Sequence, residues 1–138
     1  MEEDLDNLVF VVCGASLRAE EMDRPLAYRI QDAVYDRLEA LDSELDCMVI
    51  SDIWYLNHKA YHERPAISIG GPGVNHVSAY WWKRLESVLN IENVLLIQMD
   101  LNETPRACLW GMDHDHTVEA LDTFEQKGYL DRFIEAMA

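Results

Sequence analysis

The chain has 138 residues, of which 49% are hydrophobic, and its 26 Asp and Glu against 11 Lys and Arg give a formal net charge of −15. This length and composition fit one domain, residues 1–138, with one sizeable core. The acidic balance argues against nucleic acid as a partner, which requires a basic face, and against anionic membrane surfaces. No apolar run reaches the ~18 residues of a membrane span, and the acidic start at residues 1–4 does not resemble a secretory signal, so the sequence predicts a cytoplasmic protein.

The first half of the chain alternates predicted strands and helices. Leu8–Cys13 is an unbroken apolar run, which is typical of a strand buried on both faces. A helix follows, with Asp23 as its N-cap and Pro25 in its first turn. Its apolar residues at helical spacing are Leu26, Ile30, Ala33, Val34, Leu38 and Leu41. Residues 47–50 and 66–69 predict the second and third strands, and residues 53–61 between them leave room for a short helical turn.

The second half begins with a glycine-rich loop at residues 70–76. Helical spacing after this loop predicts a second helix from Val77, Trp81, Leu85, Val88 and Leu89. Residues 93–99 and 107–110 predict the fourth and fifth strands, and the short gap between them predicts an antiparallel hairpin. A final helical region is expected with Thr117 as its cap, divided in two by Gly128.

The resulting order is β-α-β-β-α-β-β-α. Buried strands alternating with amphipathic helices predict an α/β fold, a three-layer Rossmann-like sandwich. Its sheet would be mostly parallel, with about five strands and a C-terminal antiparallel hairpin. The second and third strands are close in sequence, so residues 53–61 would have to supply the crossover between them.

The glycine loop is the strongest indication of a ligand site. Glycines let a backbone approach a ligand closely, and ligands of open α/β sheets bind beyond the carboxyl ends of the parallel strands. The predicted strand tips carry seven candidate ligand-binding residues, namely Ser16, Arg18, Asp52, Gly70, Gly71, Gly73 and Asn75. We therefore expect a small polar or anionic ligand, phosphate-like or nucleotide-like. The loop matches neither GxGxxG nor the phosphate-binding GxxxxGK(S/T) pattern, so the cofactor is left open.

A second polar cluster, residues 113–116, follows the fifth predicted strand. Asp113 and His114 are the candidate acid–base residues, since histidine titrates near neutral pH. They would join the other strand tips only if the fifth strand runs parallel to the first three. The i, i+2 spacing of His114 and His116 makes their side chains diverge unless the backbone is extended. We therefore expect no metal site there, but a solvated loop in which Asp115 or Thr117 caps the last helix.

Cys13 and Arg18 flank a short loop after the first strand. In cysteine-dependent phosphatases five residues separate the catalytic cysteine from its arginine, whereas four separate them here. The loop is one residue too short to wrap a phosphate with its N–H groups. The sequence therefore predicts that Cys13 is a buried structural residue. An odd count of three cysteines without close spacing also predicts no disulfide framework.

An alternative hypothesis is a non-catalytic structural or protein-interaction module, a homodimer formed through the helix that carries Trp81 and Trp82. One of these two rings is expected in the core and the other at the surface. The two hypotheses differ in one structural requirement. Ligand binding requires Arg18, Asp52 and Asn75 to converge on one open cleft, whereas an interaction module leaves them as turns and caps.

Overall fold

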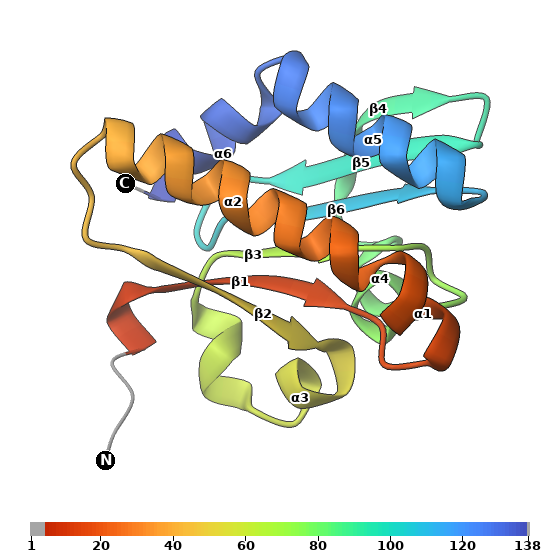
Figure 1. The fold of residues 1–138 in the computed structure, drawn as a ribbon, viewed down its shortest axis with the longest axis horizontal. Helices are drawn as coiled ribbons and strands as arrows, with labels where there is room; N and C mark the ends of the chain where they lie inside the picture. Colours follow the sequence, from red (N-terminus) through yellow and green to blue (C-terminus); the bar gives the residue numbers. More distant parts are fainter. Residues whose placement is uncertain (1–4, 138) are drawn as a thin grey trace.

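Six strands form one sheet in the spatial order β2-β1-β3-β6-β5-β4 (Figure 1). The computed structural model describes residues 5–137; the acidic start at residues 1–4, named above for the secretory signal, lies outside them. The strands are β1 (Leu8–Cys13), β2 (Asp46–Ser51), β3 (Ala66–Ile69), β4 (Glu86–Ile91), β5 (Leu95–Asp100) and β6 (Arg106–Gly111). The four strands β2, β1, β3 and β6 are parallel, and β5 and β4 continue the sheet as antiparallel strands. The predicted α/β class and mostly parallel sheet are confirmed, with six strands where about five were expected.

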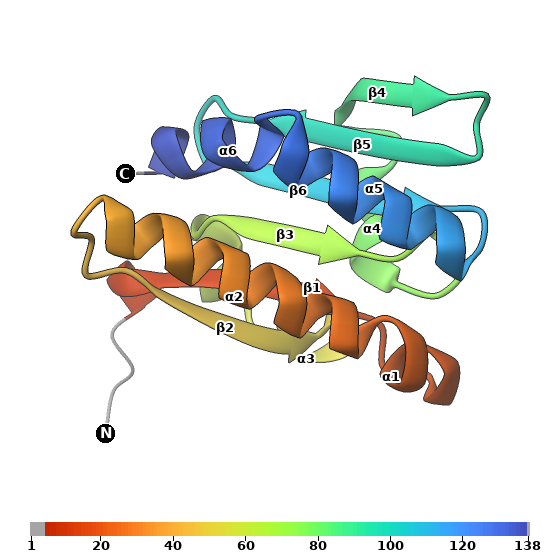
Figure 2. The ribbon, with the colours of Figure 1, turned by 45° about the horizontal axis from the view of Figure 1, so that its top comes forward.

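Helices cover both faces of this sheet (Figure 2). One face carries α2 (Arg24–Ala40), α5 (His114–Gln126) and α6 (Tyr129–Met137). The other face carries α3 (Asp52–Leu56), the 3-10 helix η2 (Lys59–Glu63) and α4 (His76–Trp81). Two short elements complete the order, the 3-10 helix η1 (Leu5–Asn7) and α1 (Leu17–Met22). Within residues 5–137, every helix is too short or too polar to cross a lipid bilayer.

The central strand β1 is buried along its whole length, as its apolar run predicts. Alternate side chains point to opposite faces of a strand, so β1 contributes to two cores. Val9 and Val11 pack in the cluster beneath α2, α5 and α6, whereas Phe10 packs in the cluster beneath α3 and α4. The Phe10 ring stacks on that of Tyr61, with 4.7 Å between the ring centroids.

Two helical predictions are confirmed. Pro25 lies in the first turn of α2, where its missing N–H has no helical partner to lose. Gly128, with φ +83°, separates α5 from α6 as expected. The short elements α3 and η2 occupy the stretch in which a helical turn was sought, and they connect β2 to the parallel strand β3.

The predicted helix after the glycine loop is wrong beyond Trp81. There α4 ends, and residues 86–91 form the edge strand β4. Glu92 and Asn93 have φ of 51° and 61°, the backbone of a tight hairpin turn, and they reverse the chain from β4 into β5. The apolar residues Val88 and Leu89 therefore belong to a strand, and their helical spacing from Trp81 is coincidental.

The connections leave the parallel strands toward opposite faces of the sheet. The loops after β1 and β6 lead to helices on the α2 face, whereas the loop after β3, the central strand of the three, leads to α4 on the other face. Neighbouring strands whose connections diverge in this way leave a crevice beyond their carboxyl ends. The candidate site lies in that crevice.

Candidate functional site

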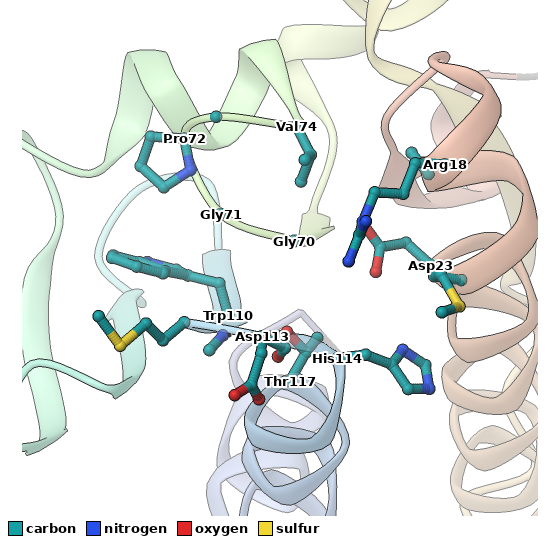
Figure 3. A pocket seen from close by; sticks show the side chains of 15 residues that line it. Arg18, Asp23, Gly70, Gly71, Pro72, Val74, Trp110, Asp113, His114 and Thr117 are labelled. Carbon is teal, nitrogen blue, oxygen red and sulfur yellow. Dashed lines mark hydrogen bonds between the residues drawn. The ribbon is translucent and has the colours of Figure 1, made fainter.

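A cavity of about 290 Å³ opens at the carboxyl ends of β3 and β6 (Figure 3). Its walls come from three parts of the chain that are distant in sequence: α1 with the start of α2, the glycine loop after β3, and the end of β6 with the first turn of α5. Because β6 runs parallel to β3, the polar cluster at residues 113–116 does reach the same edge of the sheet as the glycine loop. Asp113 and His114 were expected to join the other strand tips only if their strand runs parallel to the first three, and β6 does so.

The glycine loop forms one wall. Gly70 has φ +103°, a conformation that favours glycine, and its N–H donates to the carbonyl of Leu109 on β6 at 2.9 Å. The loop also packs closely on the turn after β1, since a Cβ on Gly14 would overlap the carbonyl oxygen of Val74. Gly71 lies against the ring of Trp110, where a Cβ would approach Cε3 to 3.1 Å. These contacts hold the loop against both neighbouring strands and fix one side of the cavity.

Asn75 does not line the cavity. It is 1% exposed and caps α4, accepting from the N–H groups of Val77 and Ser78 at 2.9 and 3.2 Å. Its side-chain amide donates to the carbonyls of Val12 and Ile69 at 3.2 and 2.9 Å. Asn75 therefore ties the far end of the glycine loop to β1 and β3, and all of its hydrogen-bonding groups are used in doing so.

Asp52 is also engaged behind the loop. It is fully buried, and its Oδ2 accepts from the backbone N–H of His76 at 2.7 Å and lies 2.8 Å from Nδ1 of the same histidine. Its Oδ1 accepts from the N–H of Ile53 at 2.8 Å. The carboxylate therefore joins the start of α3 to the start of α4.

The seven predicted ligand-binding residues thus divide into two groups. Arg18, Gly70, Gly71 and Gly73 line the cavity. Ser16 caps α1, accepting from the N–H of Ala19 at 3.2 Å, and neither it nor Asp52 nor Asn75 is among the lining residues. The expected convergence of Arg18, Asp52 and Asn75 on one open cleft does not occur. The side chains of Asp52 and Asn75 are hydrogen-bonded to helix starts and to the backbone of neighbouring strands, and they do not face the cavity.

Asp113 is the N-cap of α5, and the prediction that Thr117 or Asp115 caps this helix is wrong. The Asp113 carboxylate accepts from the N–H of His116 at 2.9 Å and lies 2.7 Å from His116 Nδ1. These hydrogen bonds hold the pKa of Asp113 below its usual value. Thr117 lies one turn into the helix, where its hydroxyl donates to the Asp113 carbonyl and accepts from the N–H of Gly111.

His114 extends from the first turn of α5 toward α1 and α2, on the side of the cavity where Asp23 lies (Figure 3). Its Nδ1 is buried and has no hydrogen-bond partner within residues 5–137. The imidazole of His114 and the guanidinium of Arg18 are both close enough for their charges to act on the carboxyl group of Asp23. The cavity therefore has a polar end made of an arginine, a histidine and a carboxylate.

Asp23 is the site residue that the sequence reasoning missed. It occupies the N-cap position of α2, as predicted, but its φ and ψ of −94° and −32° are helical because α1 runs directly into α2. Its side chain makes no capping hydrogen bond and lines the cavity, 7% exposed. Burial raises the pKa of Asp23, and the charges of His114 and Arg18 oppose that rise. In the sequence, Asp23 was interpreted only as a helix N-cap before Arg24 and Pro25, and so it was not considered as a cavity residue.

The remaining cavity wall is apolar. Met22, Pro72, Val74, Trp110 and Met112 contribute side chains from each of the three wall segments. A site of this kind offers a surface for a hydrocarbon or ring on one side and charged groups on the other.

Cys13 plays no nucleophilic part. It ends β1 with no exposed surface, and burial raises the pKa of its thiol to about 11. Only a thiolate is strongly nucleophilic, so a thiol with this pKa is inert near neutral pH. The expected structural role of Cys13 is confirmed.

In the part of the chain that the structure describes, no three His, Cys, Asp or Glu side chains gather in an arrangement that could hold a metal ion. Comparisons with protein-family models, with curated proteins and with solved structures find no match to this chain.

Proposed function

We propose that the chain binds a small polar molecule with an anionic group in the cavity at the carboxyl ends of β3 and β6. The observation that carries this proposal is the convergence of Arg18, the glycine loop and the first turn of α5 on one cavity of about 290 Å³. Three segments distant in sequence meet there, at the position where open α/β sheets bind their ligands.

Arg18 is the proposed contact for the anionic group. Its side chain is exposed at the cavity and forms no ion pair within residues 5–137, unlike Arg24, Arg29 and Arg37. A guanidinium offers a planar fork of donors that matches a carboxylate or phosphate. Met22 and Trp110 on the cavity wall would contact the apolar part of the ligand.

If the site is catalytic, His114 is better placed than Asp113 to transfer a proton. His114 lines the cavity and its charge acts on Asp23, whereas the carboxylate of Asp113 is occupied by His116. In this proposal His114 is the acid–base residue and Asp113 positions it by starting α5. The reaction classes that suit these groups are hydrolysis and group transfer at an anionic or nucleotide-like substrate.

The proposal is tested by isothermal titration and thermal shift against inorganic phosphate, nucleoside monophosphates, small carboxylates and free amino acids. A ligand selective for the native state must raise the melting temperature. Arg18→Gln is expected to weaken binding of an anion about tenfold or more, since a charge-assisted contact is lost. Arg132→Gln is the matched control, because it removes the same charge from an exposed site on α6 outside the cavity. Equal effects of the two variants, or no ligand from any class, would contradict the proposal.

The homodimer alternative has one specific observation in its favour. Trp81 is buried, whereas Trp82 and Tyr80 on either side of it are 42% and 54% exposed, so the expectation of one core ring and one surface ring is confirmed. Exposed neighbouring rings favour self-association, and the net charge of −15 opposes it. Light scattering across protein concentration, at low and high salt, distinguishes a dimer from a monomer. Trp82→Ser would restore the monomer if α4 forms the interface.

A further inference from the structure

We infer that the ligand of this cavity is a zwitterion of about amino-acid size, with a protonated amine at Asp23 and its carboxylate at Arg18. This inference rests on the proposed function and narrows its ligand class. It begins from Asp23, a residue 7% exposed whose side chain makes no hydrogen bond or ion pair within residues 5–137.

Seven polar or charged residues are buried within residues 5–137. Asp23 makes no side-chain hydrogen bond and no ion pair there, whereas the other six are hydrogen-bonded: Asp52, Ser68, Asn75, Ser78, Gln98 and Thr117. Asp23 lines the cavity with only 7% of its surface exposed, and carboxylates so largely buried normally have a hydrogen-bond donor. The missing donor at Asp23 is best supplied from the cavity that the residue lines.

The charges around the cavity match a ligand that carries both signs. Arg18 acts on the charge of Asp23 without coming within ion-pair distance of it in the described structure. Figure 3 shows the two side chains on the same side of the cavity. An ammonium group provides three donors, and a charge-assisted bond to a carboxylate is about twice as strong as a neutral one. An adjacent carboxylate on the ligand then meets the fork of the guanidinium.

A phosphate ester fits these charges less well. Its anionic oxygens would approach the carboxylate of Asp23, which makes no hydrogen bond or ion pair within residues 5–137. A ligand with an amine and no anionic group would be repelled by the positive charge of Arg18. The zwitterion satisfies both groups at once, because its charges are only a few bonds apart.

Cavity size and lining limit the rest of the ligand. The volume of about 290 Å³ is just below the roughly 300–1,000 Å³ typical of ligand pockets, so the ligand must be small. Met22, Trp110 and Met112 offer an apolar surface beside the charged end. An amino acid with an apolar side chain matches this combination.

The test uses three sets of compounds, and the members of each set share one side chain. Each set contains an amino acid, the corresponding acid without the amine and the corresponding amine without the carboxylate. The amino acids are L-methionine, L-leucine and L-phenylalanine, and all compounds are titrated by calorimetry. We expect one of the amino acids to bind at least tenfold more tightly than either of its partners. Asp23→Asn should abolish the preference over the deaminated acid, and Arg18→Gln the preference over the amine. Glu21→Gln is the matched control, an exposed carboxylate on α1 outside the cavity, and should leave both preferences intact.

The outcomes separate this inference from the proposed function. If a deaminated acid, inorganic phosphate or a nucleotide binds as tightly as the amino acids, and Arg18→Gln weakens that binding, the zwitterion is excluded while the proposed function stands. If no compound of any class binds, both fail. The wild-type ratio of amino acid to deaminated acid decides the matter even if Asp23→Asn does not fold, and a ratio near one overturns the inference.

Discussion

The Oδ2 atom of Asp23 lies 2.8 Å from the position that a Cβ on Gly70 would occupy. The carboxylate of Asp23, between α1 and α2, therefore reaches the glycine loop after β3 only because Gly70 has no side chain. Gly70 also has φ +103°, which side-chain-bearing residues rarely adopt. One position thus meets two requirements, a backbone conformation and a close approach, and both bring Asp23 to the cavity.

Gly70→Ala is expected to lower the free energy of unfolding by at least ~1–2 kcal/mol, since alanine is strained at this φ and crowds Asp23. Gly73→Ala is the control, because a Cβ there meets no atom within 4 Å. Its stability should stay within about 0.5 kcal/mol of wild type. Urea denaturation of both variants measures the difference. Equal stability of the two variants would contradict the close approach of Asp23 to the loop.

Asp23→Asn is expected to stabilise the protein at pH 7 by about 1 kcal/mol, or roughly 3–5 °C in melting temperature. Burial raises the pKa of Asp23 in the folded state, so the folded protein holds this proton more tightly than the unfolded chain. The contribution of Asp23 to stability is therefore largest below its unfolded pKa and is lost as the pH rises through the folded value. The advantage of the variant should shrink as the pH falls toward 4.

Asp113→Asn provides a control of opposite sign for that pH series. Hydrogen bonds from His116 lower the pKa of Asp113, so its contribution is present above the unfolded pKa and is lost as the pH falls. Asparagine also caps helices well, so the variant tests the charge rather than the cap. It should be slightly less stable than wild type at pH 7 and equal to it in acid. If both variants shift stability in the same direction at pH 7, the burial of Asp23 does not control its titration.

The thiols are expected to be unreactive in the native protein at pH 8. Burial raises the pKa of Cys13 to about 11 and the pKa values of Cys47 and Cys108 to about 12. Labelling with a chromogenic disulfide should therefore be slow in the native state and should reach three thiols per chain in denaturant. One rapidly labelled native thiol at Cys13 would reopen the nucleophilic reading that the structure excludes.

The predictable part of this fold is the part with strong periodicity or uniform burial. The apolar run Leu8–Cys13 could only be an interior strand, and the helix bounded by Pro25 showed a clear apolar stripe. The edge strand β4 has neither signal, since most of its side chains are exposed and only Leu89 packs into the core cluster. Its hairpin turn contains Asn93 but no glycine, so the usual turn signature is weak.

The position of the cavity was predicted, but only four of the seven predicted ligand-binding residues line it. Glycines and Arg18 at strand tips indicated the edge of the sheet at which the cavity opens, because parallel strands end together there. The types Ser, Asp and Asn at the same tips serve helix caps equally well, and Ser16, Asp52 and Asn75 all proved to start helices. Asp23 was read as a cap and is the residue whose side chain faces the cavity. Only the tertiary structure separates these two uses of one residue type.

Asn75→Ala tests this division between anchoring and binding. The variant loses the cap of α4 and leaves the buried carbonyls of Val12 and Ile69 without their donor, so we expect a loss of ~3 kcal/mol in unfolding free energy. Ser16→Ala loses only an exposed cap and should cost about 1 kcal/mol. Arg18→Gln should change stability by less than about 0.5 kcal/mol, because Arg18 makes no ion pair or hydrogen bond within residues 5–137. Denaturant titration of the three variants measures this order. A residue kept for a ligand contributes little to the stability of the free protein. A large loss of unfolding free energy in Arg18→Gln, with a small loss in Asn75→Ala, would therefore mean that the anchoring and binding roles are reversed.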